Sequence, residues 1–158
     1  MTGTTARLGT YGHRGRRLLP KTKKLLDSYM AGIVDGEGAI SLLCGSSGYY
    51  QCRLSVSNTC QELLEQVHLT YGGSEVRFVK GSEKHRQCYV WYVNGQAALP
   101  VLKLLLPFLI VKREHAKLAI TFLETCAPGT GRRLSEAQFD ESERLAQEMR
   151  KHNMKGPQ

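Results

Sequence analysis

The sequence has no apolar run long enough to cross a membrane, and its first 24 residues contain no acidic side chain. The longest apolar stretch, residues 104–111, is interrupted by Pro107 and bracketed by Lys103 and Lys112, whereas a membrane helix needs about 20 apolar residues. The basic N-terminus lacks the apolar segment of a secretory signal. These absences predict an intracellular protein with no membrane partner.

Cysteine and histidine clusters with metal-ligand spacing are also missing. The cysteines form no CxxC pair and their number is odd, with most of them in apolar segments: Cys44, Cys52, Cys60, Cys88 and Cys126. Thiols stay reduced inside cells, where a free cysteine behaves as a small buried hydrophobe. We therefore expect neither a disulfide framework nor a zinc site.

What the sequence does have is a basic excess that is confined to its beginning. The net charge is +8, and residues 1–24 carry seven Lys or Arg, which leaves fifteen basic and fourteen acidic residues for the remainder. We expect residues 1–21 to form a basic, disordered arm that favours a polyanion partner, most often nucleic acid. A solvated terminus without a role and an organelle transit peptide are the alternatives. Residues 22–153 are expected to form a single domain, followed by a tail, residues 154–158.

Hydrophobic periodicity divides the predicted domain into helices and strands. Thr22, Asn94, the Thr59–Glu62 pair and the Ser135–Gln138 pair supply candidate helix caps. The predicted helices cover residues 23–35, 59–71, 95–106, 112–125 and 135–152, and the predicted strands cover residues 38–45, 49–58, 74–81 and 86–93. Two strand pairs with a helical layer indicate an α+β fold with an antiparallel sheet.

One face of that sheet is expected to be polar. In the second strand Tyr50, Cys52, Leu54 and Val56 alternate with Gln51, Arg53, Ser55 and Ser57, so the apolar set faces a core and the polar set faces solvent or a partner. The face that Tyr89 and Trp91 occupy stays open, although strand aromatics more often belong to the core.

The first helix has an unusual composition for a helix. Gly32 lies in its interior, where glycine costs about 1 kcal/mol relative to alanine, and Gly36 follows four residues later on the same face. With Ala31, these glycines would let a second helix approach closely. Termination of the helix is the alternative, but it accounts only for Gly36 or Gly38. Two acids, Asp35 and Glu37, stand at the helix end.

These residues carry a family resemblance. Residues 30–38, MAGIVDGEG, resemble the LAGLIDADG motif, with Met30 for the first Leu and Glu37 for the last acid. SVSNT at residues 55–59 and PFLIVK at residues 107–112 extend the resemblance over about residues 25–126. The sequence therefore resembles the LAGLIDADG homing endonucleases of the single-motif type.

The resemblance implies an αββαββα fold whose antiparallel sheet forms a DNA-binding saddle, with additional C-terminal helices. It implies a homodimer in which two glycine-lined helices cross, with interface residues Ala31, Gly32, Asp35 and Gly36. The implied activity is cleavage of both DNA strands at a long, near-palindromic site. Such genes lie in mobile introns, so the implied location is a chloroplast, a mitochondrion or a bacterial cytoplasm.

The resemblance also assigns the reactive residues. The Glu37 carboxylate and the Gly36 backbone carbonyl correspond to Mg²⁺ ligands; Mn²⁺ is expected to substitute, and Ca²⁺ to bind without supporting cleavage. Lys112 and Asn58 complete the implied catalytic set with Glu37. A solvated lysine at a helix start and an asparagine in a turn or cap are the alternatives for these two residues. Asp35 is expected to make structural hydrogen bonds.

Side chains on the polar sheet face are candidates for DNA contact. The predicted set is Ser41, Leu43, Gln51, Arg53, Ser55, Arg77, Val79, Lys80, Lys84 and Arg86, of which the last three flank a hairpin tip and suit phosphate. A regulator that binds DNA without cutting it, a maturase that binds intron RNA, and an interaction domain with a solvated sheet are the alternative functions.

Overall fold

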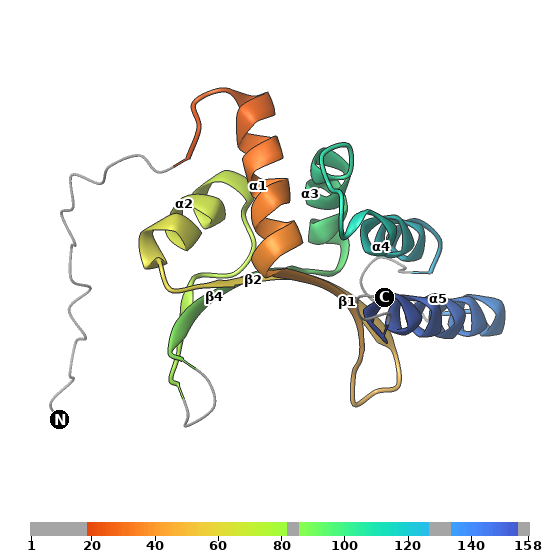
Figure 1. Ribbon diagram of the computed structural model, residues 1–158. Helices are drawn as coiled ribbons and strands as arrows, with labels where there is room; N and C mark the ends of the chain where they lie inside the picture. Colours follow the sequence, from red (N-terminus) through yellow and green to blue (C-terminus); the bar gives the residue numbers. More distant parts are fainter. Residues whose placement is uncertain (1–18, 82–85, 127–133, 155–158) are drawn as a thin grey trace, which may run out of the picture.

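The computed structural model describes residues 19–81, 86–126 and 134–154. The described elements follow the predicted order of helix, two strands, helix, two strands and further helices (Figure 1). Their bounds are α1 Lys23–Glu37, β1 Gly38–Cys44, β2 Tyr50–Asn58, α2 Gln61–Tyr71, β3 Arg77–Val79, β4 Cys88–Asn94, the 3₁₀ turn η1 Gly95–Ala97, α3 Ala98–Leu105, α4 Arg113–Thr125 and α5 Glu136–Met154.

The four strands form one antiparallel sheet in the order β1-β2-β4-β3, which confirms the predicted α+β class. Figure 1 shows the sheet as an arch, with α1, α2 and α3 above it and the β1–β2 hairpin descending on one side. The helices pack on a single face because the buried side chains of the strands, such as Ile40, Leu54 and Trp91, point that way. The opposite face of the arch is mostly polar.

The β1–β2 hairpin follows the alternation of its sequence. Ser41 pairs with Arg53 and Leu42 with Cys52, so polar and apolar pairs alternate along the ladder. The hairpin closes through the predicted glycine turn, in which the Gly48 backbone N–H donates to the Gly45 carbonyl over 3.0 Å. Gly48 has a φ of 81°, a left-handed conformation that glycine adopts without strain.

Trp91 lies in the core, which answers the question that the sequence leaves open. Its side chain is 0% exposed, Tyr89 packs against the same cluster, and the indole Nε1–H donates to the Gly72 carbonyl over 2.7 Å. Gly73 approaches the strand so closely that a Cβ would lie 2.7 Å from the Tyr92 carbonyl oxygen. Glycines therefore both end α2 and let the chain pack against β4.

The third strand is shorter than predicted. The prediction of a strand over residues 74–81 is wrong at both ends, since β3 contains only Arg77–Val79. The Ser74 N–H donates to the Tyr92 carbonyl over 2.7 Å, but the Tyr92 N–H donates to the Ser74 hydroxyl instead of a backbone carbonyl. The Ser74 side chain thus replaces a backbone acceptor of the β-sheet at this point, and regular strand pairing begins only at Arg77.

Only one of the predicted helix caps forms. In α5 the Gln138 N–H donates to Ser135 Oγ and the Ser135 N–H donates to Gln138 Oε1, which is the reciprocal pattern of a capping box. Thr22 and Asn94 precede their helices without a side-chain cap bond. The predicted Thr59–Glu62 cap is wrong, because α2 starts at Gln61 after Cys60.

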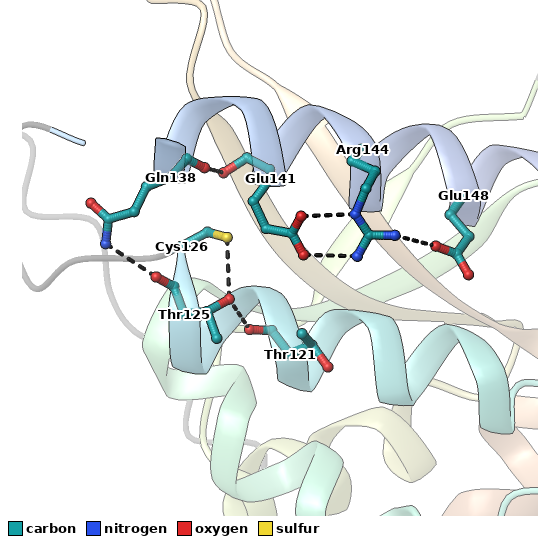
Figure 2. Close-up of polar contacts among 8 residues, drawn as sticks. Thr121, Thr125, Cys126, Gln138, Glu141, Arg144 and Glu148 are labelled. Atoms are coloured by element: carbon teal, nitrogen blue, oxygen red, sulfur yellow. Dashed lines mark hydrogen bonds and ion pairs between the residues drawn. The ribbon is translucent and has the colours of Figure 1, made fainter. Parts of the chain in front are cut away.

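Helix α5 is joined to the end of α4 by polar contacts (Figure 2). The Gln138 amide donates to the Thr125 carbonyl over 3.1 Å. Farther along, Arg144 bridges Glu141 and Glu148, and its bond to Glu141 holds the pKa of the Glu141 carboxyl below its ordinary value. On the other side of α5, Leu145, Ala146 and Met149 are buried, so this helix extends the same core.

Two residues anchor the beginning of the described chain. The predicted disordered arm, residues 1–21, is wrong at its end, because Leu19 is 6% exposed and packs into the core, while residues 1–18 lie outside the described residues. Asp27 on α1 is buried, and its carboxylate accepts from Tyr71 Oη over 2.9 Å and from Lys23 Nζ over 3.2 Å. Within the described ranges, no helix combines the length and apolar character needed to cross a membrane.

Candidate functional site

Helix α1 passes into strand β1 without a loop. α1 ends at Glu37 and β1 begins at Gly38, whose backbone N–H donates to the Val34 carbonyl. A Cβ at residue 38 would lie 2.7 Å from Val34 Cα and 2.8 Å from the Val34 oxygen, so only glycine fits the junction. The tight junction places the exposed Glu37 carboxylate where the helix meets the sheet.

Asn58, at the end of β2, holds that carboxylate. Its side-chain nitrogen donates to Glu37 Oε2 over 3.1 Å, and its oxygen accepts the Cys60 N–H over 2.8 Å. The second bond is the turn role that the sequence left open for Asn58, and it fixes the direction of the amide. The structure thus brings together two of the three residues predicted to be catalytic.

Asp35 makes the structural hydrogen bonds predicted for it. Its carboxylate accepts the backbone N–H groups of Ile110, Val111 and Lys112 over 2.8, 3.2 and 2.8 Å. Partial burial alone would raise the pKa of Asp35, but these three bonds and the Lys112 charge outweigh it and hold the pKa below its ordinary value. The carboxylate is therefore an anchor for residues 110–112.

Lys112 also reaches the end of α1. Its Nζ donates to the Asp35 carbonyl over 2.6 Å, two residues before Glu37. A cation at a helix C-terminus interacts favourably with the partial negative charge of the last carbonyls. The side chain is thus held in place, and the solvated alternative for Lys112 does not describe it. Glu37, Asn58 and Lys112 all gather at one end of α1.

The exposed face of α1 carries the two glycines. A Cβ at Gly32 or Gly36 would meet no atom within 4 Å, so both positions border open space. Leu25 and Tyr29 continue this face and are also exposed. The prediction that Ala31 contributes to the helix–helix interface is wrong, because Ala31 is 0% exposed and points into the core of its own chain.

The end of α1 offers oxygen ligands that suit a hard divalent cation. The Glu37 carboxylate is exposed, and the Gly36 carbonyl belongs to the terminal turn, where intrahelical donors run out. Among the residues that the structure describes, no three His, Cys, Asp or Glu side chains converge on one point.

Strand register places most of the predicted DNA-contact set on the polar face of the arch. Residues that pair across strands share a face, and Arg53 pairs with Ser41, Gln51 with Leu43 and Ser55 with Tyr92. Arg77 pairs with Val90, which pairs with Ser57, so the β3 residues Arg77 and Val79 join this face. Lys80 and Arg86 are exposed beside the β3–β4 hairpin, and Lys84 lies outside the described residues.

The sequence-based set omits the two residues of this face that lie against Arg53. Tyr92 and Asn94 on β4 alternate with the buried Trp91 and Val93, and this alternation was the signal that could have placed them on the polar face. The Asn94 side chain accepts from Arg53 Nε over 2.9 Å, and the Tyr92 ring lies 4.7 Å from the Arg53 guanidinium carbon. Aromatic and amide groups therefore support the basic centre of the sheet.

A helix with a glycine-lined face, an acid at its end and an arched sheet below it define the fold class of the LAGLIDADG homing endonucleases, and the solved structures agree. I-CvuI bound to its DNA target matches with a TM-score of 0.68 at 22% identity, over 86% of this chain and 87% of that chain. The archaeal intron-encoded I-Vdi141I, also complexed with DNA, matches with a TM-score of 0.66 at 20% identity, over 82% and 85% of the two chains.

A third match has a different coverage. I-GzeII, in complex with a DNA target, matches with a TM-score of 0.62 at 17% identity, over 84% of this chain but only 45% of that chain. No protein-family model matches the sequence, and neither does any curated protein. The chain therefore has the LAGLIDADG homing endonuclease fold.

Proposed function

We propose that the protein is a site-specific DNA endonuclease of the homing type that acts as a homodimer and depends on a divalent metal. The observation that carries this proposal is the Glu37 carboxylate, exposed at the end of a glycine-lined helix and held by Asn58. A degenerate, non-cleaving copy has no need for an acid at this place. In the same fold, I-CvuI and I-Vdi141I are described as homing endonucleases in complex with DNA.

The exposed face of α1 supports the homodimer. Gly32 and Gly36 leave room for a second helix at backbone distance, and Leu25 and Tyr29 extend the face with apolar surface. The chain carries a single motif and matches less than half of I-GzeII. Two copies related by a twofold axis would supply two sheets and two Glu37 carboxylates. A twofold dimer prefers a near-palindromic site.

Mg²⁺ is the proposed cofactor, with the Glu37 carboxylate and the Gly36 carbonyl of each chain as its ligands. A Mg²⁺ ion held by these ligands would supply activation of water and stabilisation of the leaving oxygen. Structures of I-CvuI were determined in the presence of 2 mM Ca and of 2 mM Mg. For this chain we expect Mn²⁺ to replace Mg²⁺, Ca²⁺ to support binding without cleavage, and chelation to abolish cleavage.

The protein residues have separable tasks in this proposal. Asn58 donates to Glu37 Oε2 and so keeps one carboxylate oxygen oriented. Lys112, held against the Asp35 carbonyl, places a positive charge at the same helix end, where charge develops on the reacting phosphate. Arg53, Arg77 and their neighbours on the polar sheet face bind the DNA and hold it in register.

The genetic setting is part of the proposal. I-Vdi141I is described as intron-encoded. We propose the same setting for this chain, which would then act in the compartment that holds its own gene.

The experiment is cleavage of a randomised double-stranded DNA library in Mg²⁺ and in Ca²⁺, with sequencing of the ends. We expect staggered ends at one near-palindromic site in Mg²⁺ only. Glu37→Gln is expected to abolish cleavage while the variant still binds the DNA site in Ca²⁺, because the substitution removes the anionic ligand and keeps the shape of the side chain. Retention of DNA without cut ends by the native protein would favour a regulator, and retention of structured RNA alone would favour a maturase.

A further inference from the structure

Arg53 is held at the centre of the sheet by its direct neighbour on the next strand. Arg53 on β2 pairs with Asn94 on β4, and its Nε donates to Asn94 Oδ1 over 2.9 Å. Both side chains are half-buried. This bond uses Nε and does not involve the two terminal nitrogens, Nη1 and Nη2. These two nitrogens form a pair of parallel donors.

The Tyr92 ring packs against the same guanidinium. The Arg53 guanidinium carbon lies 4.7 Å from the centre of the Tyr92 ring, and that of Arg77 lies 5.6 Å from it. Stacking on a tyrosine ring is favourable for an arginine and restricts its rotation. Arg53 is therefore constrained twice, by an amide at one edge and by an aromatic face.

The constrained arginine is reachable from solvent. Arg53 is only half-buried, and its neighbours Arg77, Tyr92 and Asn94, together with Glu75, line a pocket of about 420 Å³. β2 and β4 are the two inner strands of the sheet, so the unit lies away from the sheet edges. A flexible lysine or arginine at a tip is sufficient for a phosphate, whereas a fixed fork matches a ligand with two acceptors at a fixed spacing.

We propose that Arg53 reads one guanine in the major groove of each half-site through its Nη1 and Nη2 atoms, and that Asn94 and Tyr92 are its positioning residues. Guanine O6 and N7 are the acceptor pair that an arginine fork matches in the major groove. The inference rests on the proposed DNA-binding function and deepens it, because it assigns a base to one place on the sheet.

The test is the base preference of the full-length protein at every position of the selected site, measured by binding at one fixed salt concentration in Ca²⁺. Arg53→Lys is expected to lose roughly 5- to 150-fold discrimination for guanine at one position per half-site, the range for a bidentate base contact. Asn94→Leu and Tyr92→Leu are expected to weaken the preference at that same position. Asn94→Asp and Tyr92→Phe, which keep the acceptor and the ring, are expected to retain it.

Controls separate positioning from structural damage. Lys117→Ala removes one positive charge from α4, on the helical side of the sheet, and is expected to leave the base preference unchanged. Thermal unfolding of each variant is measured alongside. A purely structural role for Asn94 or Tyr92 would weaken all positions together, and that result would overturn the assignment of positioning residues.

Two further outcomes count against the inference, and they are distinguishable. If the native protein selects a DNA site and Arg53→Lys leaves every position unchanged, the guanine assignment is wrong while the proposed function stands. If the native protein selects no DNA sequence at all, the guanine assignment and the proposed function are both wrong.

Discussion

The side-chain amide of Asn58 donates to Glu37 Oε2 over 3.1 Å while its oxygen accepts the Cys60 N–H over 2.8 Å. One asparagine thus connects the carboxylate at the end of α1 to the turn that leads into α2. Because both ends of the amide are occupied, its orientation is fixed by the backbone, and the position of Glu37 depends on where α2 begins.

Asn58→Asp tests this connection. The substitution keeps an acceptor for the Cys60 N–H but replaces the donor to Glu37 with a second carboxylate. The two carboxylates repel each other, which displaces the Glu37 side chain. Displacement of a reactive group by about 1 Å can lower a rate by about 10²-fold. We expect such a loss in single-turnover cleavage with DNA binding in Ca²⁺ largely kept; an unchanged rate would show that Asn58 does not orient the site.

Gly32→Leu separates the stability of one chain from assembly of two. A Cβ at Gly32 meets no atom of the rest of its own chain within 4 Å, and leucine is a better helix former than glycine by somewhat less than about 1 kcal/mol. We therefore expect unfolding of the variant at an equal or higher temperature, together with a monomer in sedimentation and loss of cleavage. Lys117→Leu, at an exposed position of α4, is the matched control. A stable, active Gly32→Leu dimer would refute the packing role of the glycine face.

Asp35→Asn should destabilise the segment that connects α3 to α4. The amide nitrogen would face backbone N–H donors, and loss of such partners costs about 1–3 kcal/mol. In the folded native protein, the pKa of Asp35 lies below its ordinary value of 3.8. The ionised carboxylate therefore stabilises the folded state above pH 3.8, and this stabilisation is lost as the pH falls through the folded-state pKa. The difference in the free energy of unfolding between the two proteins should be largest near neutral pH and should shrink below about pH 4. Urea unfolding at several pH values measures it, and a constant difference would contradict the assignment.

Tyr71→Phe tests a contact far from the proposed reaction. Tyr71 Oη donates to the buried Asp27 carboxylate over 2.9 Å, and burial together with this acidic partner raises the pKa of the Tyr71 hydroxyl. Removing the donor leaves a buried oxygen less well satisfied, so we expect a loss of about 1–3 kcal/mol in unfolding free energy. Tyr49→Phe, which removes an exposed hydroxyl, is the control. Equal stability of the two variants would mean that the Asp27 contact contributes nothing measurable.

Local patterns in the sequence were sufficient for much of the fold. The alternation of Cys52, Leu54 and Val56 with polar residues gave the buried face of β2, and Ser135 with Gln138 gave the start of α5. Both depend on neighbours within a few residues, so the sequence contains all the information they need. The motif at residues 30–38 likewise placed Glu37 at the end of a helix.

Contacts between distant segments could not be read in the same way. Asp35 binds Ile110 across 75 residues, and Arg53 meets Asn94 across 41 residues. Such pairs depend on strand register and on how helices pack, which periodicity does not specify. Ala31 was misplaced for a related reason: adjacent positions on a helix differ by about 100° in direction, so Ala31 points to the core while Gly32 points outward.

The junction of α1 and β1 has a mechanical consequence. Helix and strand are joined without a flexible segment, and Val34 leaves no room for a side chain at Gly38. A rotation of α1 against its twin would therefore carry the attached sheet with it. In the proposed dimer, the crossing angle of the two α1 helices would set the distance between the polar sheet faces of the two chains. A target lengthened by one central base pair would fall outside that fixed span.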